Sequence, residues 1–176
     1  MKIKPIYIFN SFLIIIVLVV LFTPLRSYLE KLQGYPPDNQ TSSTKEITLT
    51  SEQYNIDLKG INSPDTNFQS FKGKKIFLNF WATWCKPCCE EMSSIQKLYG
   101  QKKNEVQFVL IYMKDSREEV IKFLHENHYD FPVYEAVSPI DTVLLPIGFP
   151  TTFIIDEKGK ITQKIEESKD WSDFKF

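Results

Sequence analysis

The chain has 176 residues, a length that suits one domain of ordinary size. Its 21 lysines and arginines balance 22 aspartates and glutamates, which leaves a formal net charge of −1. This balance provides no argument for nucleic acid or another strongly charged partner, and we predict that the protein binds no nucleic acid.

The N-terminal segment predicts a membrane anchor. Lys2 and Lys4 precede an apolar segment over residues 6–22, which is at the short end of the lengths that span a bilayer. A cleaved signal peptide has the same general pattern, and this alternative stays open. We favour an uncleaved, single-pass anchor in the cell membrane, because residues 23–26 offer no small-x-small cleavage site. The basic end then lies in the cytoplasm, which puts the rest of the chain in the periplasm or outside the cell.

A polar, proline-containing stretch follows. Residues 34–44 show no hydrophobic periodicity and are typical of a flexible spacer. From about Gln53 onward, the pattern becomes that of a folded chain. We therefore predict an anchor over residues 1–24, a tether over 25–52 and a domain over 53–176.

The first part of the predicted domain contains two strands. Residues 54–58 alternate apolar and polar side chains, as a half-buried strand does, and residues 60–67 are rich in turn formers. Residues 76–81 are apolar on both faces except at Asn79. That pattern predicts a strand in the centre of a sheet.

A helix is expected from about Lys86 to Tyr99, with Gly100 ending it. Pro87 in its first turn costs little, because an amide at that position has no helical partner. Apolar side chains at helical spacing mark the buried face, namely Cys88, Met92, Ile95 and Tyr99.

The second part of the domain adds a further central strand over residues 106–113. Ser116 and Glu119 form a capping box, so a helix is expected from Arg117 to about Asn127. Shorter strands are expected at residues 131–134, 152–156 and 161–165, the last two joined by a hairpin turn at 157–160. Strands that alternate with helices and end in a hairpin predict an α/β domain with a mixed sheet.

Two cysteines stand where the strand 76–81 gives way to the helix. Cys85 and Cys88 are separated by two residues, a spacing that indicates a redox couple more often than anything else. Unpaired amides and the helix dipole favour negative charge at a helix start, so we expect the Cys85 thiol to have a lowered pKa. Cys88 lies one helical turn further on, near enough to close a disulfide.

Two other interpretations of this pair stay open. The cysteines could be inert core residues, or they could be half of a zinc site. A zinc site would need two more ligands, for which the chain offers Cys89, His125 and His128. All three cysteines of the chain lie within residues 85–89, whereas a structural disulfide framework would spread them along the sequence.

Two motifs make the chain recognisable. Residues 80–88 read FWATWCKPC, and residues 148–153 read GFPTTF. Together they resemble the thioredoxin-like superfamily, and within it the membrane-anchored TlpA/ResA-type thiol-disulfide oxidoreductases. The resemblance covers about residues 55–165. It implies a thioredoxin-like α/β fold, with a mixed central sheet flanked by helices and an N-terminal transmembrane helix.

The resemblance also implies roles for matching residues. Cys85 matches the nucleophile and Cys88 the resolving cysteine. Pro150 matches a proline preceded by a cis peptide bond, which would place the backbone of Phe149 to Thr151 beside the dithiol, where a substrate strand can pair. We add Trp84, next to the nucleophile, to this substrate-binding set.

Glu91 is the candidate acid-base residue. From the pattern alone, it is either a surface group at the edge of the apolar helix face or a buried carboxyl. By resemblance it matches a glutamate near the dithiol, with the role of taking the proton from Cys88. Cytoplasmic thioredoxins carry a buried aspartate where this chain has Asn79. An asparagine cannot accept a proton, which moves the acid-base task toward Glu91.

Cys89 departs from the family pattern. It lies on the polar side of the predicted helix, so we expect partial exposure. The simplest interpretation is a tolerated small residue. The alternative is an extra thiol that exchanges with Cys85. Cys85 and Cys89 have three residues between them, a spacing that is shared with Sco-type copper chaperones. Copper binding would need His125 or His128, which we expect at the surface near a helix end.

The resemblance implies an enzyme that needs no cofactor or metal. We expect a monomer that reduces disulfides of protein substrates, for example apocytochrome c, with electrons from a thiol protein of the membrane. A peroxidase of the peroxiredoxin type would need a Pro-x-x-x-Thr-x-x-Cys loop, which is absent before Cys85.

Relatives usually end in a full helix, whereas here little follows Ile165. We expect one or two helical turns at most in residues 170–176. Aromatic side chains are expected to fill the gap, namely Trp171, Phe174 and Phe176.

Overall fold

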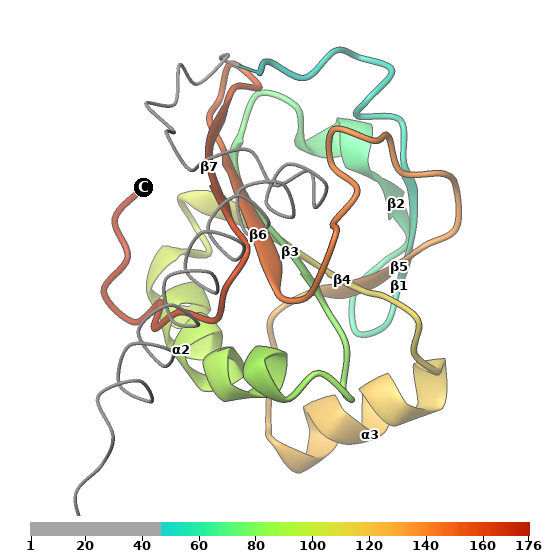
Figure 1. The fold of residues 1–176 in the computed structure, drawn as a ribbon, viewed down its shortest axis with the longest axis vertical. Helices are drawn as coiled ribbons and strands as arrows, with labels where there is room; N and C mark the ends of the chain where they lie inside the picture. Colours follow the sequence, from blue (N-terminus) through green and yellow to red (C-terminus); the bar gives the residue numbers. More distant parts are fainter. Residues whose placement is uncertain (1–46) are drawn as a thin grey trace, which may run out of the picture. The chain divides into compact units, whose positions relative to one another are not determined.

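A computed structural model describes residues 47–176 (Figure 1). The predicted anchor, and all but the end of the predicted tether, lie outside these residues. Within residues 47–176, no helix is both long enough and apolar enough to cross a bilayer.

The described residues form a seven-stranded mixed sheet in the order β2-β1-β5-β4-β3-β6-β7. The central strand β3 pairs in parallel with β4 and antiparallel with β6. The strands are β1 (Asp57–Gly60), β2 (Thr66–Asn67), β3 (Lys75–Trp81), β4 (Val106–Tyr112), β5 (Val133–Ala136), β6 (Thr151–Ile155) and β7 (Ile161–Ile165). The helices are η1 (Phe68–Phe71), α2 (Lys86–Lys102) and α3 (Arg117–Glu126). The predicted α/β class and the two central strands are confirmed.

The alternation of side chains along β3 divides the core into two parts. Phe77 and Trp81 pack with α2 and α3 on one face of the sheet, whereas Ile76, Leu78 and Phe80 pack with η1 on the other. Figure 1 shows α2 and α3 together and η1 away from them. A strand that is buried on both faces needs apolar side chains at nearly every position, which is why residues 76–81 are so apolar.

Both predicted helices are present, and one end differs from the prediction. The Ser116 hydroxyl accepts the amide N–H of Glu119 at 3.1 Å, as the capping box predicted. The prediction that Gly100 ends α2 was wrong, because the helix continues to Lys102 and the Lys103 amide still bonds to the Tyr99 carbonyl at 2.9 Å. A glycine costs a helix only about 1 kcal/mol, which is too little to stop one that is packed on a core.

The first predicted strand also differs from the structure. Tyr54 and Ile56 are buried, yet they precede the strand, which begins only at Asp57. Alternation therefore reported which side chains are buried, and not where strand pairing begins. Similarly, β5 begins at Val133, two residues later than predicted. The ordered chain also starts before Gln53, because the Leu49 amide donates to the Gly159 carbonyl at 2.8 Å.

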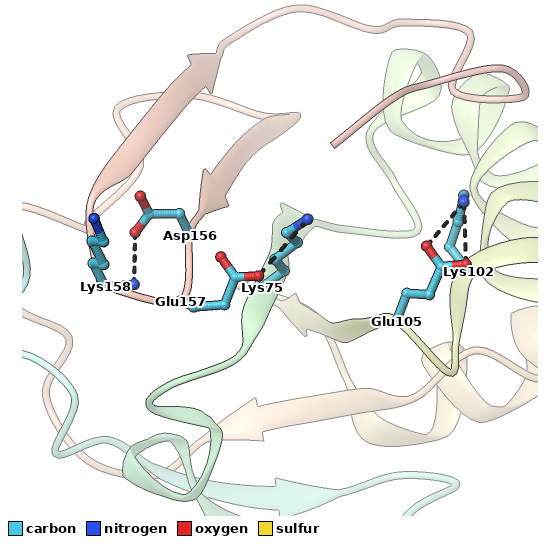
Figure 2. Close-up of polar contacts among 6 residues, drawn as sticks. All are labelled: Lys75, Lys102, Glu105, Asp156, Glu157 and Lys158. Atoms are coloured by element: carbon cyan, nitrogen blue, oxygen red, sulfur yellow. Dashed lines mark hydrogen bonds and ion pairs between the residues drawn. The ribbon is translucent and has the colours of Figure 1, made fainter.

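The hairpin between β6 and β7 turns where the sequence predicted. Gly159 has a φ of 82°, which a glycine adopts without strain. The Asp156 carboxylate accepts the Lys158 amide at 2.9 Å, as Figure 2 shows. Figure 2 also shows Lys75 near Glu157, with 3.8 Å between Nζ and Oε1. Such exposed ion pairs contribute little stability, so the turn depends on the glycine and on Asp156.

The C-terminal segment after β7 contains no helix. Trp171 is fully buried, and its ring meets that of Phe77 edge-on at 4.9 Å. Phe176 contacts the Phe77 and Phe108 rings, each at 6.4 Å. The expectation that aromatic residues replace a terminal helix is confirmed.

Candidate redox site

Cys85 and Cys88 lie at the N-terminal end of α2 and form a disulfide. Cys85 is the N-cap residue, and its sulfur accepts the amide N–H of Cys88 at 3.3 Å. This amide and the helix dipole favour a thiolate at Cys85 when the pair is reduced. Cys85 is 6% exposed and Cys88 is 0% exposed. Cys85 is therefore the more accessible of the two residues, as its predicted role as the nucleophile requires.

The loop before β6 contacts Trp84, the residue that precedes Cys85. The Phe149–Pro150 peptide bond is cis, as predicted. The Phe149 ring contacts the Trp84 ring at 5.8 Å in a T-shaped arrangement. Trp84 is 59% exposed, whereas Pro150 and Thr151 are buried. The structure thus brings the four predicted substrate-binding residues together, and their role stays a prediction.

Glu91 is buried in α2, one helical turn after Cys88, so the surface alternative for this residue was wrong. It is 2% exposed. Its Oε1 accepts the Asn79 side-chain amide at 3.0 Å. Its Oε2 accepts the Trp171 indole N–H at 2.9 Å and the Lys169 backbone N–H at 3.2 Å. Burial raises the pKa of Glu91 above its usual value, and these three hydrogen bonds oppose that rise.

Asn79 connects Glu91 to the sheet. Its side-chain N–H group also donates to the Thr152 hydroxyl at 2.9 Å, while its buried carbonyl oxygen has no partner. Asn79 therefore acts as a donor to the Glu91 carboxyl and offers no titrating group of its own. The Glu91 carboxyl and Cys88 lie one helical turn apart on the buried side of α2, and proton exchange between them stays a prediction.

Comparison with known proteins agrees with this geometry. The family model described as Redoxin matches residues 54–175. The chain belongs to the Redoxin family. The thioredoxin-like protein YneN of Bacillus subtilis is 36% identical over 137 residues, covering 74% of this chain and 81% of that protein. The thiol-disulfide oxidoreductase ResA of Bacillus cereus is 31% identical over 138 residues, covering 76% of each chain.

Solved structures show the same fold. StoA from Bacillus subtilis is 26% identical with a TM-score of 0.54, covering 65% of this redoxin and 88% of StoA. A thioredoxin-family thiol:disulfide interchange protein from Chlorobium tepidum is 20% identical with a TM-score of 0.61, covering 75% and 93%. The fold is thioredoxin-like, and the protein is a TlpA/ResA-type thiol-disulfide oxidoreductase, as the sequence motifs predicted.

The third cysteine of this redoxin is half-buried, as predicted. The Cys89 thiol donates to the Thr83 carbonyl at 3.3 Å. Burial raises the pKa of Cys89, and the nearby Asp115 carboxylate adds to the rise. A thiol that resists ionisation is a poor nucleophile, which favours the interpretation of a tolerated small residue.

The metal-binding interpretations find no support in the part of the chain that the structure describes. Within residues 47–176, no group of three or more His, Cys, Asp or Glu side chains is arranged to hold a metal ion. His125 and His128 are exposed at and just after the C-terminal end of α3, as expected.

The sequence did not predict three features of the site. The first is that the segment after β4 is hydrogen-bonded to the residues before the disulfide. The Asp115 carboxylate accepts the Thr83 amide N–H at 2.6 Å, and the Lys114 carbonyl accepts the Trp84 indole N–H at 2.9 Å. The second is that Ile147, just before the GFPTTF motif, is 91% exposed. The third is the hydrogen bond that the Trp171 indole N–H donates to Glu91. Only the exposed Ile147 left a signal in the sequence, as an apolar residue outside any strand pattern.

Proposed function

We propose that this redoxin is a membrane-anchored reductase that acts on protein disulfides outside the cytoplasm. The observation that carries the proposal is the Cys85–Cys88 disulfide at the start of α2, with the Phe149 ring of the loop before β6 against Trp84. The basic and apolar N-terminal sequence supports the anchor and the location.

In the reduced enzyme, the Cys85 thiolate attacks one sulfur of a substrate disulfide. A bond forms between Cys85 and that sulfur, the substrate S–S bond breaks, and the other substrate sulfur leaves as a thiolate. Cys88 gives its proton to Glu91 and attacks the Cys85 sulfur, which closes the enzyme disulfide and releases the second substrate thiolate. A pair of electrons passes to the substrate.

The surroundings of the disulfide suit a polypeptide substrate. Trp84, which precedes Cys85, and Ile147, three residues before the buried Pro150, are both exposed apolar side chains. Apolar residues flanking a substrate cysteine can pack there while the sulfur reaches Cys85. Apocytochrome c is the substrate that we propose, with a thiol protein of the membrane restoring the reduced enzyme and the reductase acting as a monomer.

The reduction potential of the full chain, equilibrated with glutathione buffers, tests the direction of electron flow. We expect a value near that of thioredoxin, about −270 mV, because a reductase must hold its electrons weakly. A value near about −120 mV, typical of a strong oxidant, would contradict the proposal.

A second measurement tests the location. A fusion of residues 1–40 to a reporter that works only outside the cytoplasm should be active and stay with the membrane fraction after an alkaline wash. A soluble, shortened product would show that the N-terminal segment is a cleaved signal.

A further inference from the structure

The C-terminal segment reaches the redox site from outside both sequence motifs. Trp171 is 0% exposed, and its indole N–H donates to Glu91 Oε2 at 2.9 Å. Its backbone N–H donates to the Ser94 hydroxyl at 3.0 Å, and that hydroxyl donates to the Glu91 carbonyl at 2.7 Å. Trp171 is thus attached to α2 through its side chain and through its backbone.

Packing alone does not require this hydrogen bond. The Trp171 ring already contacts the rings of Phe77 at 4.9 Å and Phe174 at 5.2 Å. Trp81 provides a comparison within the same core cluster, because it is equally buried and its indole N–H has no partner. The fold therefore tolerates a buried indole without a partner, whereas the Trp171 N–H is directed at a carboxyl oxygen.

The bond completes a set of donors around one carboxyl group. Asn79 holds Oε1 from β3, while Trp171 and the Lys169 amide hold Oε2 from the C-terminal segment. Glu91 lies one helical turn after Cys88 on the same buried side of α2. We propose that Trp171 is a positioning residue that holds the Glu91 carboxyl in place for proton exchange with Cys88, so that the C-terminal segment belongs to the redox site. The inference rests on the proposed function, in which Glu91 takes the Cys88 proton.

The groups around Glu91 limit what else can change its proton affinity. The element β3 offers the neutral Asn79, and α2 offers the sulfurs of Cys85 and Cys88. The C-terminal segment offers the Lys169 ammonium, which lies over the Trp171 ring at 5.3 Å from its centre. Among the three hydrogen bonds that oppose the effect of burial, the one from Trp171 lowers the pKa of Glu91 most. Removing this N–H should therefore favour the protonated carboxyl, which cannot accept a proton from Cys88.

The test uses the reduced full chain and an aromatic disulfide that releases a coloured thiolate. The first release reports attack by Cys85, and the second reports attack by Cys88 on the mixed disulfide. We expect Trp171→Phe to move the pH profile of the second step toward higher pH, while the first step stays unchanged. The second step should be about three- to tenfold slower at a pH below the wild-type midpoint.

Two controls separate positioning from packing. In a Glu91→Gln background, Trp171→Phe should produce no further change in the second step, because the bond that it removes no longer positions an acid-base group. Trp81→Phe removes an equally buried indole that has no partner, so it should leave the pH profile unchanged. If Trp171→Phe slows the second step equally in both backgrounds, or if Trp81→Phe gives the same shift, Trp171 is only a packing residue and the proposal fails.

A second variant covers the case in which Trp171→Phe does not fold. Replacing Trp171 with 3-benzothienylalanine keeps the shape of the ring and replaces only the N–H by sulfur, and the same shift is expected. Failure of the proposed function has a separate signature, because the wild type would then show an oxidant's reduction potential. If the wild type has a reductase's potential and Glu91→Gln alone slows the second step, the absence of Trp171–Glu91 coupling would overturn the role of Trp171 alone. If Glu91→Gln leaves the second step unchanged, the proposed acid-base role of Glu91 fails instead.

Discussion

The two faces of β3 bury different kinds of side chain. On the face toward η1, Ile76, Leu78 and Phe80 pack in a cluster of buried hydrophobic side chains. On the face toward α2, Asn79 meets the buried carboxyl of Glu91. Burying a carboxyl costs free energy, and the raised pKa of Glu91 indicates that its three hydrogen bonds do not offset the whole cost, so this pair is a poor way to stabilise a sheet. Under the proposed function, the face toward η1 stabilises the fold, whereas the face toward α2 also holds the acid-base residue Glu91.

The largest expected effect lies at the sulfurs on the α2 face. Cys88→Ser should abolish turnover and trap a mixed disulfide between Cys85 and the substrate, because no second sulfur remains to attack it. Non-reducing electrophoresis of the variant with a disulfide-bonded protein substrate would reveal the trapped species. Cys89→Ser is the matched control, and it should leave turnover within a few-fold. Loss of turnover in this control would make Cys89 a working part of the site.

A large effect of another kind is expected on the η1 face. Leu78→Ala should lower the free energy of unfolding by about 2–5 kcal/mol, because Leu78 is fully buried and the truncation leaves a cavity. Urea denaturation of the oxidised protein measures this loss. Val137→Ala, at a residue that is 58% exposed, should change the free energy of unfolding by less than about 0.5 kcal/mol. A strong shift in the pH profile of Cys88 in Leu78→Ala would contradict the proposed division between the two faces.

The smallest effect concerns Glu91 and the pH dependence of stability. Burial raises the pKa of Glu91 above 4.5, so the folded state holds this proton more tightly than the unfolded state. The stabilisation from the protonated form is present below pH 4.5 and is lost as the pH rises through the folded-state pKa. Glu91→Gln should therefore remove one component of the decline in stability above pH 4.5.

Denaturation midpoints measured from pH 4 to pH 8 test this prediction. Glu90→Gln is the matched control, because Glu90 lies next in the helix and is exposed, and it should keep the wild-type slope. Identical slopes in the wild type and Glu91→Gln would show that Glu91 does not titrate differently on folding.

Much of the fold was predictable because its signals are local. The apolar strand over residues 76–81, the capping box at Ser116 and the turn at Gly159 each depend on neighbouring residues, and all three appear as predicted. The element ends were less predictable. The helix through Gly100 and the late start of β1 at Asp57 depend on packing and on strand partners, which periodicity does not report.

The sequence by itself determined the cysteine pair, because two cysteines with two residues between them at the start of a helix lie one turn apart and can close a disulfide. It also determined the cis proline, through a motif that the family shares. Only the tertiary structure decided that Glu91 is buried and that Trp171, 80 residues away, donates to it. Hydrogen bonds between distant segments depend on the path of the chain, and no spacing rule links a residue in α2 to one in an irregular C-terminal segment.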